Sequence, residues 1–180
     1  MFEKFRKGTK ESSENNDPEA VRKAEIEKIY GTVFVVESSQ DMSFENLISS
    51  AGVTNVDSRI TEEKFPRLER LGSSNMQVVA SARDSFIEDT LGYLEKEGQH
   101  PATIHDLLEF MPQCPELVWR LCALGSLVDE DNKKFCVVVV KKEGNVSLSL
   151  QELGQETFRD GVTHYYTPWP ASLLTVQNVQ

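Results

Sequence analysis

The stretch that most constrains the fold is CPELVWRLCALGSLVDEDNKKFCVVVV, residues 114–140. Its first half spaces Leu117, Leu121 and Leu124 at helical intervals and is followed by Gly125, a residue type that often ends a helix. Its second half places two apolar runs on either side of a charged turn at 129–134, which is the pattern of a β-hairpin. We therefore expect a short helix joined directly to a two-stranded hairpin.

Two further helices are expected just before this segment. Residues 83–97 carry isoleucine and leucine at helical spacing, and residues 102–111 begin with Thr103 and Asp106 in capping-box spacing. Three helices followed by a hairpin resemble the winged-helix variant of the helix-turn-helix superfamily, without pointing to a specific family. This resemblance implies an α+β fold with a winged-helix module at about 83–142.

An upstream segment repeats part of this order. LERLGSSNMQVVA (68–80) and LCALGSLVDEDNKKFCVVV (121–139) both read Leu-x-x-Leu-Gly-Ser followed by a strand-like run. Before and within the first copy, the patterns predict helices at 18–30, 43–52 and 61–72 and strands at 32–38 and 76–82. Two interpretations stay open: a second winged-helix-like module over 18–82 in tandem with the first, or a chance similarity.

The two ends of the chain differ from these modules. Residues 1–17 are polar and mixed in charge, so we expect a mobile tail. Residues 143–180 contain the aromatic stretch DGVTHYYTPWP, and we expect this C-terminal extension to pack on the domain or on a partner.

The charge balance narrows the classes of partner. The chain has 19 basic and 29 acidic side chains and a net charge of −10, and none of the segments 1–30, 31–82, 83–142 and 143–180 is net basic. The electrostatic attraction that dominates nucleic-acid affinity is therefore missing overall. Three sparse cysteines, and the lack of an apolar leader or an apolar stretch of about 18 residues, favour a cytoplasmic protein that does not bind membranes.

The leading functional hypothesis is a non-catalytic module that docks a protein partner or itself. On the expected helix at 115–124, Trp119, Ala123 and Glu116 point away from the apolar stripe, and an exposed tryptophan is a frequent interface anchor. Tyr165, Tyr166 and Trp169 of the C-terminal extension are expected to join this surface. The alternative is that this aromatic segment covers Trp119 within the same chain.

A DNA-binding regulator is the second hypothesis, since the winged-helix resemblance most often implies it. The candidate phosphate and base contacts are Arg59, Lys64, Arg67, Arg70 and Arg120. Neighbouring glutamates nearly cancel the cations at 59–70, and the expected wing begins with three acidic residues, Asp129-Glu130-Asp131. Both features favour a solvated surface over a phosphate contact.

The sequence offers little for catalysis or metal binding. It has no glycine-rich phosphate loop, no Gly-x-Ser-x-Gly and no Cys-x-x-Cys pair. A small thiol-dependent enzyme, with a cysteine, His105 and an acid as the nucleophilic set, is the third hypothesis. Against it, no cation lies next to Cys122 in the sequence to lower the pKa of this thiol. We therefore predict a protein that is not an enzyme and has no cofactor or metal.

Overall fold

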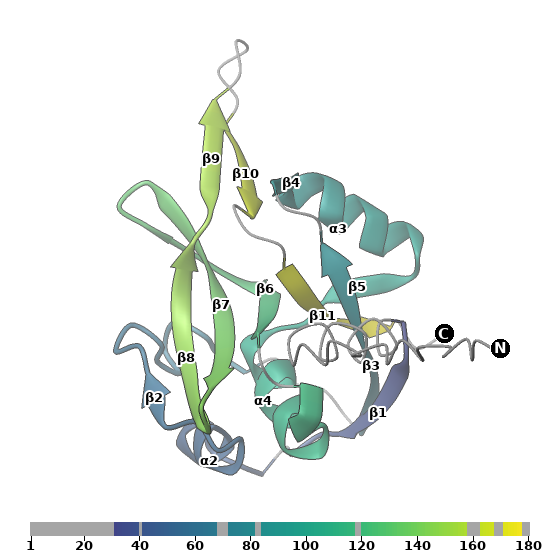
Figure 1. Ribbon diagram of the computed structural model, residues 1–180, viewed down its shortest axis with the longest axis vertical. Coiled ribbons are helices and arrows are strands. Elements are labelled where there is room, and N and C mark those ends of the chain that lie inside the picture. Colours follow the sequence, from purple (N-terminus) through teal and green to yellow (C-terminus); the bar gives the residue numbers. More distant parts are fainter. Residues whose placement is uncertain are drawn as a thin grey trace, which may run out of the picture.

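The computed structural model describes residues 31–39, 41–67, 72–81, 84–117, 120–157, 163–167 and 171–177. The tail predicted at 1–17 and the helix predicted at 18–30 lie outside these residues. Strands dominate the described part of the chain, which forms one large mixed sheet and one small sheet (Figure 1).

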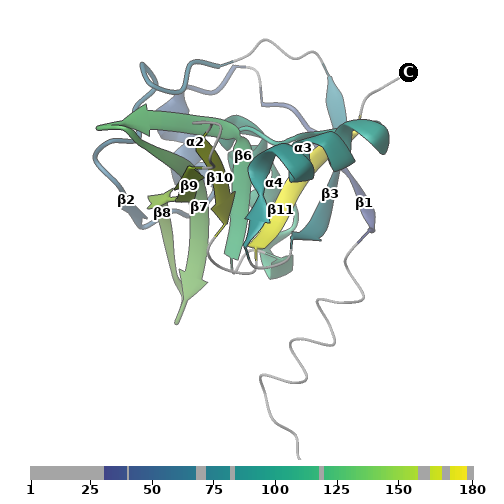
Figure 2. The same cartoon turned by 90° about the horizontal axis from the view of Figure 1, so that it is seen from above.

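The large sheet has eight strands. They are β1 Val33–Glu37, β2 Asn55–Val56, β3 Ser73–Ser81, β5 Gln99–Pro101, β6 Arg120–Glu130, β7 Lys133–Lys142, β8 Asn145–Glu152 and β11 Ala171–Gln177. Their order is β1-β3-β11-β6-β7-β8-β2, and β5 pairs with β11 outside this path. The β11–β6 and β2–β8 pairs are parallel and the other pairs are antiparallel. Figure 2 shows β1 at one border of the sheet, next to β3.

The small sheet contains β4 Ser85–Phe86, β9 Gly154–Thr157 and β10 Thr163–Thr167, in the order β4-β10-β9. It is linked to the large sheet through the chain itself, because β9 follows β8 after one residue, Leu153.

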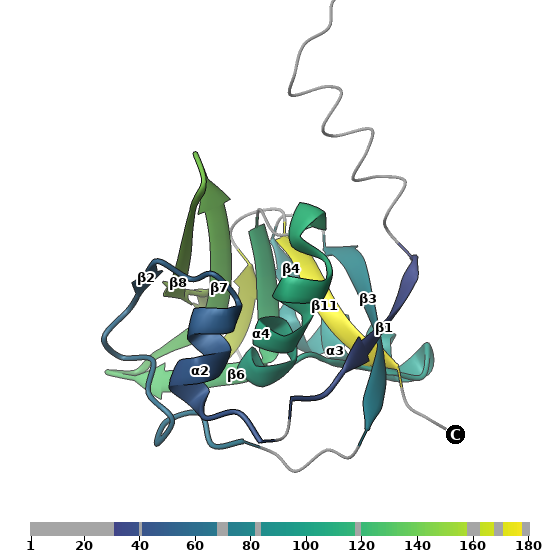
Figure 3. The same cartoon turned by 90° about the horizontal axis from the view of Figure 1, so that it is seen from below.

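Helices cover both faces of the large sheet. Two helices, α2 Phe44–Ser50 and α4 Ile104–Gln113, contribute to the larger apolar core and lie in front of the strands in Figure 3. The third helix, α3 Ile87–Lys96, contributes Ile87 and Leu91 to a second core, together with Leu173 of β11. The sheet is thus buried between two separate apolar layers.

This double burial explains the continuous apolar run in β7. Val137 and Val139 pack in the larger core with α4, whereas Cys136 and Val138 pack in the second core. A strand that is covered on both faces has no need for the alternation of apolar and polar residues that a half-exposed strand shows.

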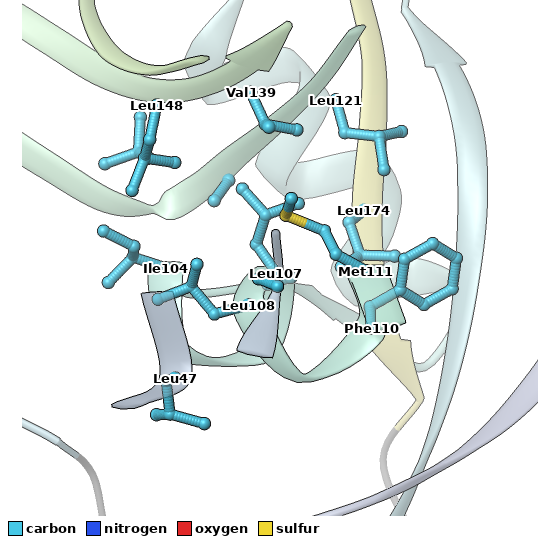
Figure 4. Close-up of a cluster of buried hydrophobic side chains, with 14 of the residues drawn as sticks. Leu47, Ile104, Leu107, Leu108, Phe110, Met111, Leu121, Val139, Leu148 and Leu174 are labelled. Carbon is cyan, nitrogen blue, oxygen red and sulfur yellow. The ribbon is translucent and has the colours of Figure 1, made fainter. Parts of the chain in front are cut away.

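The helix α4 forms the centre of the larger core. Thr103 accepts a hydrogen bond from the backbone N–H of Asp106, and the Asp106 carboxylate accepts one from the backbone N–H of Thr103 at 2.7 Å. The predicted capping box is therefore confirmed. The helix buries Ile104, Leu107, Leu108, Phe110 and Met111 against the sheet (Figure 4).

Other local predictions are also confirmed. Strands occur within the ranges predicted at 32–38 and around 76–82, and α2 begins after Ser43, whose side chain accepts from the backbone N–H of Asn46. The predicted hairpin is formed by β6 and β7. Its two turn residues, Asp131 and Asn132, both have positive φ, as a type I′ turn requires.

The winged-helix prediction for the fold class is wrong, for the module at 83–142 and for the similar module at 18–82. Its decisive third helix does not form: Pro115–Leu117 is a single 3-10 turn, and β6 begins at Arg120. β6 pairs with β11, which in turn pairs with β3, so strands from far apart in the chain share one mixed sheet. The helix expected at 61–72 is also wrong for its described part, 61–67, which forms turns.

The leucine spacing wrongly predicted a helix because both faces of β6 are buried. Leu121 lies in the larger core and Leu124 in the second core, on opposite sides of the sheet, whereas a helix would have placed both on one side. Gly125 does not end a helix but lies within β6, where the register with β7 shifts between Ala123 and Leu127. A periodic pattern in a segment this short does not distinguish a buried strand from a helix.

Candidate functional site

The residues predicted to bind a partner do not form one surface. Glu116 is exposed, but Ala123 is fully buried in the larger core. Tyr165 in β10 packs against the second core, on the other side of the sheet, with the Lys134 Nζ atom 5.0 Å from its ring centroid. The backbone of Tyr166 pairs with Phe86 and Gly154. Trp119 and Trp169 lie outside the described residues.

The cations proposed to contact DNA are engaged within the chain. The Arg59 guanidinium donates to Asp57 at 2.8 Å and to Glu130 at 3.1 Å, and Lys64 donates to Glu130 at 3.2 Å. Glu130 belongs to the acidic turn region that was expected to repel phosphate, so this carboxylate neutralises two of the candidate cations.

The other two described cations also have partners. Arg67 forms an ion pair with Glu109 of α4, and Arg120 donates to Gln151 of β8 at 2.7 Å. Arg70 lies outside the described residues. Cations that are already paired with carboxylates or amides would have to break these interactions to contact phosphate, which weakens the DNA-binding hypothesis.

The ion pair between Asp57 and Arg59 predicts that the free energy of unfolding falls in acid. Hydrogen bonds from the Arg59 side chain lower the pKa of Asp57 from 3.8 to about 2. A carboxyl with a lowered pKa in the folded state contributes stability above its unfolded pKa, and this contribution is lost as the pH falls from about 4 to about 2. Since Arg59 is 35% exposed, solvent screening limits the contribution to about 1 kcal/mol or less.

Urea unfolding of the wild type and of Asp57→Asn measures this contribution. At about pH 7 we expect the variant to have the lower free energy of unfolding, and at about pH 2 the two proteins should converge. A difference that is as large in acid as at neutral pH would contradict a role for the Asp57 charge.

The three cysteines are poor candidates for a nucleophile. All three are buried free thiols. Burial, with a smaller contribution from the Glu116 charge, raises the pKa of Cys114 to about 11. A hydrogen bond with Cys122, together with burial, raises the pKa of Cys136 still further. Reactive cysteines have lowered pKa values and partial exposure, so these thiols resemble structural ones.

In the described part of the chain, a cleft that could hold a ligand lies between α3 and the end of β3. Its volume is about 330 Å³, at the lower end of the range of about 300–1,000 Å³ that is usual for ligand sites. Val79 and Ala80 of β3, Leu173 of β11 and Leu94 of α3 form its apolar walls. The apolar stripe of α3 faces the sheet, which leaves the polar side of the helix at the mouth of the cleft.

The polar side chains that line the cleft carry carboxylates or hydroxyl groups. Asp84, Asp89, Ser81, Ser85 and Thr90 contribute to it, and none of the lining residues in the described part of the chain is lysine, arginine or histidine. Asp84 adopts a left-handed backbone conformation with φ 59°, and its N–H donates to the Thr167 carbonyl oxygen at 2.8 Å. This bond fixes the backbone at Asp84, just before β4, and places this residue at the cleft.

Aromatic rings complete the cleft. Phe86 and Tyr93 both line it, and Tyr93 is 59% exposed although it is a large side chain on a helix. An aromatic face next to carboxylates attracts a cation, and apolar walls accommodate the hydrocarbon part of a long basic side chain. The arrangement therefore suits an organic cation that carries an apolar stem.

These cleft residues were missed at the level of the sequence. The helical spacing in 83–97 identified the buried stripe, but Asp89 and Tyr93, at i and i+4, lie away from it. The sequence signal for the cleft was Tyr93, an aromatic residue one helical turn after Asp89 and outside the apolar stripe of the predicted helix. The third wall, Leu173, is about eighty residues away in the sequence, and only the pairing of β11 with β3 brings it to α3.

The described residues contain no cluster of three or more histidine, cysteine, aspartate or glutamate side chains that could hold a metal ion. None of the helices in this part of the chain has the length and apolar character needed to cross a membrane. A scan against protein-family models, a search of curated proteins and a search of solved structures each gave no match, so the candidate site stands on its geometry and chemistry.

Proposed function

We propose that this chain is a non-catalytic interaction protein that docks a basic segment of a protein partner in the cleft between α3 and β3. The observation that carries the proposal is the combination of Asp89 and Tyr93 beside an apolar cavity whose lining, within the described residues, contains no lysine, arginine or histidine. A lysine or arginine side chain would pack its stem against Val79 and Leu94 and bring its charge to the Asp89 carboxylate.

The charge of the whole chain supports this choice of partner. A protein with a net charge of −10 attracts basic segments over long range and speeds their encounter. The three buried free thiols fit a reducing compartment, and we propose a cytoplasmic location on that ground. The paired states of Arg59, Lys64 and Arg67 leave DNA binding as the weaker hypothesis.

Fluorescence anisotropy with a labelled lysine- and arginine-containing peptide tests the proposal, with a glutamate-containing peptide of the same length as the control. We expect binding of the basic peptide only, and weaker binding as salt rises, because salt screens exposed charges. Absence of binding to the basic peptide at low salt would overturn the proposal.

A pair of variants locates the binding. Asp89→Asn removes one charge from the cleft and is expected to weaken peptide binding about fivefold, the effect of losing about 1 kcal/mol. Glu95→Gln removes one charge from the same helix, but Glu95 does not line the cleft. Equal losses in the two variants would indicate a general charge effect rather than a site at α3.

A further inference from the structure

In the border strand β1, the backbone of Glu37 forms hydrogen bonds with a side chain on the side that faces away from β3. The backbone N–H of Glu37 donates to the Gln113 side-chain oxygen at 3.2 Å, and the Gln113 amide donates back to the Glu37 carbonyl oxygen at 3.3 Å. Both backbone groups of Glu37 therefore point away from β3, and Gln113 occupies the place of a neighbouring strand. Beyond Glu37, Glu109 of α4 accepts from the side chain of Ser38 and from the N–H of Ser39.

The same geometry fixes the direction of the other backbone groups in β1. In an antiparallel pair, the N–H and C=O groups of alternate residues point to opposite sides of the strand. Since those of Glu37 point outward, those of Val35 and Val33 do as well, and Phe34 and Val36 bond to β3. Among the described residues, β1 pairs only with β3, so the outward groups of Val33 and Val35 meet no partner there.

The side chains at this border are apolar as well. Val35 is 63% exposed and Val33 is 43% exposed, and they are two of only five large hydrophobic residues with such exposure in the described part of the chain. Phe34, between them, points the other way and makes an edge-to-face contact with Phe110 in the core. Exposed border strands of this kind template pairing with another chain.

We infer that β1 pairs with β1 of a second copy of this chain, antiparallel and centred on Phe34. In this register, Val33 of one copy lies opposite Val35 of the other, and each such pair exchanges two backbone hydrogen bonds. The outward groups of the two strands therefore satisfy one another, and the exposed valines meet on one face.

The charge pattern of this border does not oppose a second copy at this position. Two molecules of charge −10 repel each other, but Thr32–Val36 carries no charge and is the part of the border that the pairing uses. Glu37 falls opposite Gly31 rather than opposite another carboxylate. Gln113 already occupies the edge at Glu37, so the pairing stops there and its register is limited to this short stretch.

Such a short contact predicts a reversible dimer. Stable interfaces bury about 1,200–2,000 Å², more than two five-residue strands provide by themselves. We therefore expect sedimentation velocity to show a shift from monomer to dimer between about 1 µM and about 1 mM, the range of weak association. A protein that sediments as a monomer throughout this range would overturn the inference.

Val35→Pro tests the hydrogen bonds. Proline lacks the N–H that points outward, and it is tolerated on border strands where that N–H faces away from the sheet. The variant should keep its melting temperature to within a few degrees and remain monomeric, whereas Val35→Thr, which retains the N–H, should still dimerise. A Val35→Pro protein that dimerises like the wild type would overturn the inference.

Cross-linking tests the register. Residues that form a hydrogen-bonded antiparallel pair have Cα atoms about 5.5 Å apart, within the range that a disulfide spans. With oxidised glutathione as the oxidant, a mixture of Val33→Cys and Val35→Cys proteins should give several-fold more covalent dimer than either variant alone. Similar yields in all three samples would contradict pairing centred on Phe34. The natural cysteines are buried and do not compete.

Discussion

Replacing Arg67 with alanine is expected to lower the free energy of unfolding by about 3 kcal/mol, because the substitution strands the Glu109 carboxylate in a site that is 8% exposed. Arg67 comes from the turn region at 61–67, and Glu109 lies on α4. Glu109 also accepts from the side chain of Ser38 and the backbone of Ser39 after β1. One carboxylate therefore holds three separate segments together, and these bonds to neutral groups do not replace a lost cation.

A double-mutant cycle separates the ion pair from the packing of the arginine stem. Glu109→Gln keeps the shape and an oxygen acceptor while removing the charge that Arg67 compensates. We expect Arg67→Ala to cost at least about 1 kcal/mol less in the Glu109→Gln background, since contacting charged residues couple by about 0.5–3 kcal/mol. Urea unfolding of the four proteins measures the coupling. Purely additive effects would contradict a role for the pair.

Gly125→Ala is expected to cost about 2–3 kcal/mol, as overpacking of a filled interior does. A Cβ atom at this position would lie 2.6 Å from the Pro101 carbonyl oxygen and 2.8 Å from that of Ala102. Both contacts are with backbone, which cannot rotate away as a side chain can. The Gly125 N–H donates to the Ala102 carbonyl oxygen at 2.9 Å, so relief of the clash would lengthen this bond.

The same substitution at Gly92 is the matched control. Gly92 lies inside α3, has no positive φ, and a Cβ atom there would meet nothing within 4 Å. Alanine is the better helix former by about 0.5–1 kcal/mol, so Gly92→Ala should raise the melting temperature while Gly125→Ala lowers it. Equal effects of the two substitutions would contradict the close approach of β6 to the end of β5 and to Ala102.

The confirmed sequence predictions were those that depend on neighbouring residues. The capping box of Thr103 and Asp106 closes within one helical turn, and the hairpin at 129–134 depends on two adjacent turn residues, Asp131 and Asn132. The strand at 32–38 was evident from its β-branched composition. In each case the signal and the structure occupy the same few residues, so no distant contact was needed to decide.

The failures concern segments whose structure is decided by distant partners. Residues 120–125 became a strand because β7 pairs on one side, β11 pairs on the other, and apolar layers cover both faces. No residue pattern within 120–125 indicates that β7 and β11 will pair with this segment. The cleft depends likewise on β11, which brings Leu173 beside β3 and α3. Glu116 and Ala123 were predicted as docking residues from a helix that does not form.

The measurement that tests the proposed function most directly is a titration of the isotope-labelled protein with the basic peptide, followed by the NMR shifts of its backbone amides. We predict saturable shifts in the 84–86 turn and along α3 around Asp89 and Tyr93, with little change near Arg59, Lys64 and Glu130. Shifts that map away from the cleft, or no shifts at saturating peptide, would contradict the proposed function.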